Sequence, residues 1–245
     1  MPSRPKKKPE KRFPRKILGI QNADKKLDER WTPYRDPMDL PCPYRCLVIG
    51  SPGTGKSTLV KNLIIRANPE FDEIYLLHCD SSGTKEYDDM DVEVLDEIPE
   101  PSDPLFNSKK KKLIILDDIP YKGLSKAQKS NLERMTGYLS SHKFCSIIMT
   151  AQDGYSVFPA ARRNLNVWCF FRCYDMYAIK SLLTKSGINK KYHDIVVRHV
   201  RPDYNFFMVD RTKKTPYPIR LNGYTMLDED TLQPVKSTET DSQEV

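Results

Sequence analysis

Residues 45–58 read RCLVIGSPGTGKST, a short apolar run that leads directly into the pattern G-x-x-x-x-G-K-[ST]. Gly50, Gly53 and Gly55 allow the backbone to curl closely around a chain of phosphates, so that successive N–H groups point inward. The apolar run predicts a strand before the loop, and residues 57–67 predict a helix after it. Because both neighbours of the loop are present, the pattern predicts a phosphate-binding site.

Two side chains of this loop carry specific chemistry. In this pattern the Lys56 ammonium reaches the β- and γ-phosphates and the Ser57 hydroxyl takes one position on Mg²⁺. The N-terminal end of the following helix adds its positive dipole. We therefore expect the whole loop to contact a nucleotide, through Gly50, Ser51, Pro52, Gly53, Thr54, Gly55, Lys56, Ser57 and Thr58.

The composition sets limits on the class of protein. A chain of 245 residues has room for one α/β domain with extensions or for two small domains. No run of 18 apolar residues occurs, so we expect no membrane-spanning helix and no membrane partner. The six cysteines show no compact disulfide framework, which favours an intracellular compartment. The Cys42/Cys46 and Cys169/Cys173 spacings leave zinc as a weak alternative, because Cys46 and Cys169 lie in predicted core strands.

The positive charge is concentrated at the N-terminus. Residues 1–16 hold eight Lys or Arg and one Glu, so they account for the net charge of +7. This segment is predicted to be a basic disordered arm that contacts nucleic acid, an acidic partner or an import receptor, or that only aids solubility. Residues 17–41 are predicted to be an extended lead-in, residues 42–226 the folded domain, and residues 227–245 an acidic disordered tail.

The folded region alternates between apolar runs and helical patterns, which is typical of a mostly parallel sheet with helices on both faces. Helices are predicted at 126–141, where Ser125 and Gln128 match a capping box, and at 174–185. Two further strands, 204–209 and 219–221, predict a C-terminal β-hairpin. The strands predicted within the sheet are 46–49, 73–78, 92–95, 113–116, 146–150 and 167–171.

A run of four lysines, residues 109–112, precedes the strand at 113–116. We expect these lysines to form a solvated start of the strand, with contact to DNA as the alternative.

The segment KKLIILDD, residues 111–118, predicts the second half of the site. An apolar strand that ends in an acid presents that acid at the carboxyl edge of the sheet, next to Mg²⁺. Asp117 is expected to hold the metal. Asp118 is expected to orient or deprotonate the attacking water, or else to cap the following turn.

Two later segments supply further candidates. The strand at 146–150 ends in Ala-Gln-Asp, and Gln152 is the candidate sensor that contacts the γ-phosphate or the lytic water; an ordinary turn residue is the alternative. Arg162 and Arg163 precede the strand at 167–171 and are candidates for an arginine finger that acts on a neighbouring subunit's nucleotide, or for surface ion pairs.

The combination of GSPGTGKST, LIILDD, TAQD and PAARRN resembles the FtsK–HerA superfamily of DNA-pumping ATPases. The motif order and the short length are most similar to the genome-packaging ATPases of poxviruses, other large DNA viruses, virophages and Polinton-type elements. The resemblance implies a P-loop NTPase fold of the ASCE or RecA-like class. It also implies a homo-oligomeric ring that uses ATP and Mg²⁺ to drive double-stranded DNA into a capsid, with the capsid protein as a partner at the intracellular site of virion assembly.

Other classes of protein fit less well. A regulatory GTPase would carry Asn-Lys-x-Asp and Asp-x-x-Gly, and neither pattern is present at the corresponding sites, residues 189–192 and 117–120. A ring ATPase that acts as a replication initiator or helicase shares the loop and the acids, so it stays open as the alternative. A structural DNA-binding protein with an inactive loop is disfavoured because Lys56, Ser57 and Asp117 are all intact.

Overall fold

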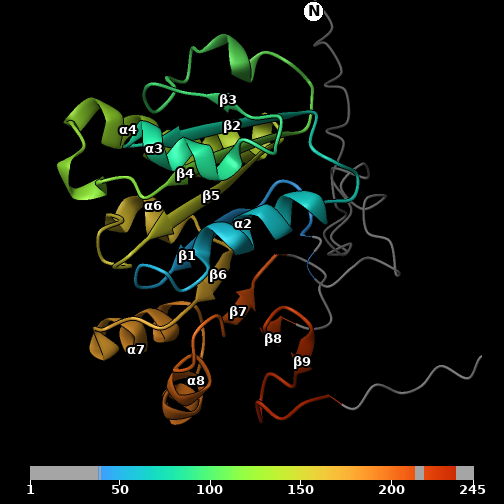
Figure 1. Cartoon of the computed structure of the whole chain (residues 1–245), viewed down its shortest axis with the longest axis vertical. Coiled ribbons are helices and arrows are strands. Elements are labelled where there is room, and N and C mark those ends of the chain that lie inside the picture. The colour runs from blue at the N-terminus through green and yellow to red at the C-terminus, as the bar shows by residue number, and fades with distance from the viewer. Residues whose placement is uncertain (1–37, 39, 213–217, 236–245) are drawn as a thin grey trace, which may run out of the picture. The chain divides into compact units, whose positions relative to one another are not determined.

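The central feature is a nine-stranded sheet, mostly parallel, in the order β3-β2-β4-β5-β1-β6-β7-β8-β9 (Figure 1). The computed structural model describes residues 38, 40–212 and 218–235. The basic arm and nearly all of the extended lead-in lie outside these residues. The strands are β1 (Arg45–Ile49), β2 (Glu73–His78), β3 (Glu93–Val94), β4 (Lys112–Asp117), β5 (Cys145–Ala151), β6 (Val167–Phe170), β7 (Phe207–Asp210), β8 (Ile219–Leu221) and β9 (Thr225–Leu227).

The strand β5 lies between β4 and β1 and pairs in parallel with both. It therefore separates the strand that ends in the acidic pair from the strand that leads into the phosphate loop. This order agrees with the ASCE or RecA-like P-loop fold that the resemblance implies. It brings the carboxyl ends of all three strands to one edge of the sheet.

Both faces of the sheet are buried. Along β4, Leu113 and Ile115 pack into the apolar cluster on one face, and Ile114 and Leu116 pack into the cluster on the other. This double burial explains why β4 reads as a continuous apolar run. The prediction of helices on both faces is confirmed.

The first face is covered by α2 (Lys56–Ile65), with Leu59, Val60 and Leu63 in its cluster. The segment after β2 packs on the same side and contains α3 (Ser81–Thr84) and a 3₁₀ turn at Lys85–Tyr87. Residues of four further helices enter the cluster on the opposite face: α4 (Lys126–Arg134), α6 (Pro159–Arg163), α7 (Met176–Lys185) and α8 (His193–His199). The short helix α5 (Ser140–His142) lies between α4 and α6 along the chain.

The helix predicted at 126–141 is present but not uniform. Its capping box is formed as expected, with Ser125 and Gln128 each bonded to the other's backbone N–H. A π-helical segment, Met135–Leu139, separates α4 from α5. Inside it, the buried Thr136 hydroxyl donates to the carbonyl of Leu132 at 2.9 Å, which diverts a backbone acceptor from the regular ladder.

The C-terminal strands continue the sheet in antiparallel order, since β7 pairs with β6 and β8 pairs with β7. The predicted hairpin is therefore confirmed, and β9 adds a strand that was not predicted. Beyond it, Leu227 bridges to Pro234 and the Asp228 carboxylate accepts the backbone N–H of Thr231 at 2.8 Å. Residues 227–235 are thus structured, and the prediction that the disordered tail starts at 227 is wrong in this part.

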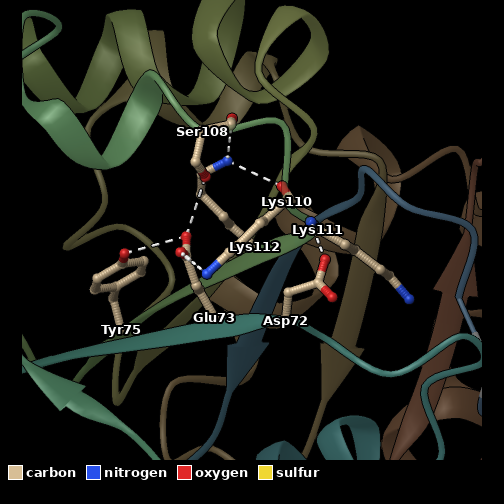
Figure 2. Close-up of polar contacts among 7 residues, drawn as sticks. All are labelled: Asp72, Glu73, Tyr75, Ser108, Lys110, Lys111 and Lys112. Atoms are coloured by element: carbon tan, nitrogen blue, oxygen red, sulfur yellow. Dashed lines mark hydrogen bonds and ion pairs between the residues drawn. The ribbon is translucent and has the colours of Figure 1, made fainter.

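The lysine run leads into β4, whose first residue is Lys112, at the end of the strand away from the acidic pair. Figure 2 shows Lys110, Lys111 and Lys112 of this run. Lys112 is 0% exposed, and its ammonium donates to the carbonyls of Ser108 and Lys110 at 2.8 and 2.9 Å. Its burial lowers the pKa of Lys112. Lys110 is exposed and pairs with Glu73 at 2.9 Å. The expected solvated start of the strand is confirmed for Lys109 and Lys110. It is wrong for Lys112, because its buried ammonium donates to carbonyl groups of the loop that precedes the strand.

Within the part of the chain that the structure describes, no helix is long and apolar enough to cross a bilayer.

Candidate functional site

The phosphate loop is attached to the carboxyl ends of two neighbouring strands. The Gly50 N–H donates to the carbonyl of Ala151 at 3.1 Å, and the Ser51 N–H donates to the carbonyl of Arg172 at 2.8 Å. These bonds fix the first residues of the loop to the chain that follows β5 and β6. The loop is therefore held by the sheet before any ligand contacts it.

Two of the loop glycines are required by the geometry. A Cβ at Gly50 would lie 2.6 Å from both the Phe171 Cβ and the Thr54 hydroxyl, so no larger residue fits there. Gly55 has φ +100°, a conformation that side chains disfavour, and it is the N-cap of α2. The first N–H groups of α2 thus open into the loop, as phosphate binding requires.

Lys56 lies across the loop. Its ammonium donates to the carbonyl of Ser51 at 3.2 Å. Burial lowers the pKa of Lys56, while the carboxylates of Asp118 and Asp117 oppose that shift. The ammonium therefore faces both the loop and the acidic pair, which is where the terminal phosphates of a nucleotide would lie.

Asp117, at the end of β4, is 4% exposed, and two hydroxyls hold its carboxylate. The Tyr87 hydroxyl donates to its Oδ2 at 2.8 Å, and the Thr150 hydroxyl donates to its Oδ1 at 2.5 Å. A buried carboxylate that accepts one bond on each oxygen has a fixed orientation. Tyr87 and Thr150 are functional residues that the sequence analysis missed.

Tyr87 connects the two groups predicted to bind the metal. Its hydroxyl donates to Asp117, and the Ser57 side chain lies beside it. Burial, followed by the negative charge of Asp117, raises the pKa of Tyr87, so it remains a neutral donor. A single hydroxyl thus stands between Ser57 and Asp117. These hard oxygen groups are the kind that Mg²⁺ prefers, so the residues present fit that ion.

Asp118 and Gln152 are in direct contact. Asp118 has φ +50°, an uncommon conformation for a residue with a side chain, and its N–H donates to the Thr150 hydroxyl at 2.9 Å. The Gln152 amide donates to both carboxylate oxygens of Asp118 at 3.2 Å. The structure therefore brings the candidate base and the candidate sensor together. The uncommon backbone conformation thus falls on a residue whose carboxylate contacts Gln152, and such conformations cluster at functional sites.

The two candidate arginines differ in environment. Arg162 is 9% exposed and its guanidinium stacks on the Tyr155 ring at 4.7 Å, where the Lys185 ammonium also lies at 4.8 Å. Arg163 is exposed. Both arginines lie shortly before Asn166, whose side-chain oxygen accepts the N–H of Arg45. Arg45 is the first residue of β1, and the phosphate loop follows the other end of that strand. The structure thus brings neither arginine to this chain's own site, and of the two only Arg163 is open to a neighbouring subunit.

Comparison with known proteins agrees with this geometry. Residues 46–167 match the profile of the family described as "ATPase family associated with various cellular activities (AAA)". A comparison with curated protein sequences gives no match. The chain therefore contains a P-loop ATPase domain, whose activity is ATP hydrolysis.

Solved structures with a similar fold include two viral proteins and a conjugation coupling protein. The B204 DNA-packaging ATPase of Sulfolobus Turreted Icosahedral Virus matches with TM-score 0.50 at 15% identity, over 76% of this chain and 97% of B204. The B204 genome-packaging NTPase of Sulfolobus turreted icosahedral virus 2, in complex with sulfate, matches with TM-score 0.52 at 16% identity, over 73% and 95% of the two chains. The pCW3 conjugation coupling protein TcpA, with ATPgS, matches with TM-score 0.51 at 14% identity, over 73% and 59%. At these identities the likeness establishes the fold, and it is consistent with the FtsK–HerA superfamily.

The bond between Tyr87 and Asp117 yields a first prediction. Tyr87→Phe removes the hydroxyl that orients the carboxylate, and we expect the Mg²⁺ concentration for half-maximal ATPase activity to rise ~10- to 100-fold, the usual cost of losing such a support. ATPase rates titrated with Mg²⁺ at fixed ATP measure this effect. Tyr75→Phe is the matched control, because the Tyr75 hydroxyl also donates to a carboxylate, that of Glu73, at the opposite edge of the sheet. Equal half-saturation in both variants would contradict the assignment.

The separate environments of the two acids yield a second prediction. Asp118→Asn is expected to lower kcat by ~10²-fold or more, since it removes the group that activates water, and to leave ATP binding intact. Asp117→Asn is expected to act mainly by weakening the binding of Mg²⁺. Single-turnover hydrolysis and nucleotide titrations of both variants distinguish these effects. Identical behaviour of the two variants would show that the roles are not divided in this way.

Proposed function

We propose that this protein is an ATP-driven double-stranded DNA translocase that packages a viral genome into a capsid. The observation that carries the proposal is the extent of the fold match: the domain that holds the site spans 97% and 95% of two packaging ATPases, against 59% of the coupling protein. The motif order points the same way. The proposed setting is the site of virion assembly inside the host cell, with the capsid protein as a partner.

The hydrolysis site uses groups at one edge of the sheet. Lys56 and the N–H groups of the loop neutralise the charge that develops on the phosphates. Mg²⁺, when bound through Ser57 and Asp117, adds to that neutralisation and fixes the phosphate oxygens. Tyr87 and Thr150 keep the Asp117 carboxylate in place. Asp118 accepts the proton of the attacking water.

The contact between Gln152 and Asp118 offers a way to couple hydrolysis to the bound state. As described, the Gln152 amide donates to both oxygens of Asp118, so it competes with the attacking water for these oxygens. A γ-phosphate competes for the same amide. Nucleotide binding then draws Gln152 away and frees Asp118 to act on water, so that the base becomes active only when triphosphate is present.

In a ring of identical subunits, each nucleotide site receives a further cation from the neighbouring subunit. Within the described residues of one chain, Lys56 is the cation that faces both acids of the site. In the proposed homo-oligomer, Arg163 of one subunit reaches the nucleotide of the next. The basic arm, residues 1–16, is proposed to follow the DNA backbone.

The response to DNA tests the proposed function. We expect long linear duplex DNA to raise the steady-state ATPase rate, because a translocase turns over only as it moves along its track. Forked and single-stranded DNA of equal nucleotide concentration are the comparison substrates. Stimulation by these alone would favour the replication helicase instead, and no turnover under any condition would contradict an active motor.

The exposure of Arg163 gives a prediction about subunit cooperation. Arg163→Ala is expected to lower kcat by ~10³-fold or more with little loss of ATP binding, the scale known for arginine fingers. Mixing this variant with Lys56→Ala should partly restore activity, because some interfaces in a mixed ring combine an intact loop with an intact arginine. Arg201→Ala, which removes another exposed arginine, is the control. Mixed oligomers that stay inactive would rule out action between subunits.

A further inference from the structure

A second cavity adjoins the phosphate loop, and the phosphate chemistry above does not use it. Its volume is about 210 Å³. Gly55 and Thr58 belong both to the loop and to the wall of this cavity, so the two sites are continuous. Its other walls are mainly aromatic or apolar and come from α2, from the end of β6, from the segments around β7 to β9 and from the residues before β1: Met38, Leu59, Asn62, Phe171, Tyr204, Phe206, Asn222 and Tyr224.

The position of this cavity along the loop identifies the part of the ligand it faces. If Gln152 is the proposed γ-phosphate sensor, the terminal phosphate lies on its side of the loop. Ser51 and Pro52 are on that side, since they line a different cavity together with Gln152. Thr58 is at the opposite end of the loop, one residue beyond the group that binds the metal. A triphosphate that runs from Gln152 toward Thr58 therefore leaves its nucleoside at the second cavity.

We propose that this cavity binds the purine base of the nucleoside triphosphate, and that the Tyr204 ring is the surface on which the base stacks. The proposal depends on nucleotide binding by the phosphate loop and not on the DNA-packaging function. It adds a site formed by α2 and by the segments beside β6, β7 and β9 to a catalytic centre formed at the ends of β1, β4 and β5.

Tyr204 is held in an unusual place for an aromatic residue. Tyr204 is 71% exposed, yet its ring lies over the phosphate loop. A Cβ added at Gly55 would lie 3.2 Å from the Tyr204 Cδ1. Its backbone has φ +65°, an unfavourable conformation for a bulky residue. Strain of this kind persists where the surrounding structure fixes it, and it is common at ligand sites.

The neighbouring residues fix the walls of the cavity. Asn222, which also has a positive φ, accepts the Phe206 N–H on its side-chain oxygen at 2.8 Å. This bond connects the turn between β8 and β9 to the start of β7. The Phe206 and Phe171 rings pack at 5.2 Å beneath. The floor is therefore rigid and apolar, and the exposed ring of Tyr224 is a second aromatic surface at the rim.

The lining predicts recognition by stacking. The side-chain oxygen of Asn222 is engaged by Phe206, and its amide donates to Asn205 at 3.3 Å. Aromatic rings attract any base through its π-face, and the two-ring purines offer more area than the one-ring pyrimidines. The site is thus suited to ATP over CTP or UTP.

The test compares ATP with inorganic tripolyphosphate, which has the phosphates without the base. With Tyr204→Ala in the full chain, we expect the Kd for Mg–ATP in calorimetric titrations to rise roughly 5- to 100-fold, the range for loss of one base–aromatic stack. The Kd for tripolyphosphate should stay within about twofold of wild type, because the loop is intact. Tyr177→Ala is the control, since Tyr177 is 88% exposed on α7 and lines neither cavity.

Two further measurements guard against a general effect on folding. Tyr204→Phe keeps the ring and should bind ATP like wild type. Wild type should bind ATP more tightly than CTP, and Tyr204→Ala should lose most of that preference. An unchanged ATP affinity in Tyr204→Ala, or an equal loss for ATP and tripolyphosphate, would overturn the proposal. A wild-type protein that binds neither ATP nor tripolyphosphate would instead contradict the claim that the phosphate loop binds phosphates.

Discussion

The hydroxyl of Thr150 connects the two halves of the catalytic centre. It accepts the Asp118 N–H and donates to the Asp117 carboxylate, so one side chain on β5 sets the position of both acids at the end of β4. This contact is possible only because β5 lies directly beside β4, with its other side against β1. The order of strands thus determines the distance between the acids and the phosphate loop. A different neighbour for β4 would leave the acidic pair without this support.

The surroundings of the site explain why such support is needed. Asp117 is almost fully buried, and a buried carboxylate is costly unless hydrogen bonds satisfy it. Tyr87 supplies the second bond, from a segment that packs on α2. Lys61 of α2 also donates to the carbonyl of Glu86 in this segment, at 2.9 Å. The helix after the phosphate loop, the Tyr87 segment and the acidic strand therefore form one connected unit. A shift of α2 on nucleotide binding would reach Asp117 through these bonds.

The nucleotide is proposed to be held by two parts of the sheet with different chemistry. The parallel strands β4, β5 and β1 present charged and polar groups to the phosphates. The segments that precede β7 and β9 supply the aromatic residues Tyr204, Phe206 and Tyr224 of the proposed base site, and Phe171 follows β6. Hydrolysis needs the first part to be preorganised, since charge develops on the phosphates in the transition state. Affinity for the base depends on stacking area, which tolerates a more exposed site.

The sequence by itself determined the phosphate loop, the acidic strand and the parallel order, because these depend on local patterns: glycines at fixed spacing, an apolar run that ends in acids, and strands that alternate with helices. It also predicted every strand except β9 within a few residues, and the capping box of α4. Tertiary structure alone showed that Tyr87 and Thr150 hold Asp117, that Gln152 contacts Asp118, that Lys112 is buried and that Arg162 lies inside while Arg163 is exposed. The sequence analysis gave no role to Tyr204 either. These features come from residues tens of positions apart that meet only when the sheet is assembled, and a side-chain hydrogen bond between distant segments leaves no periodic signal in the chain.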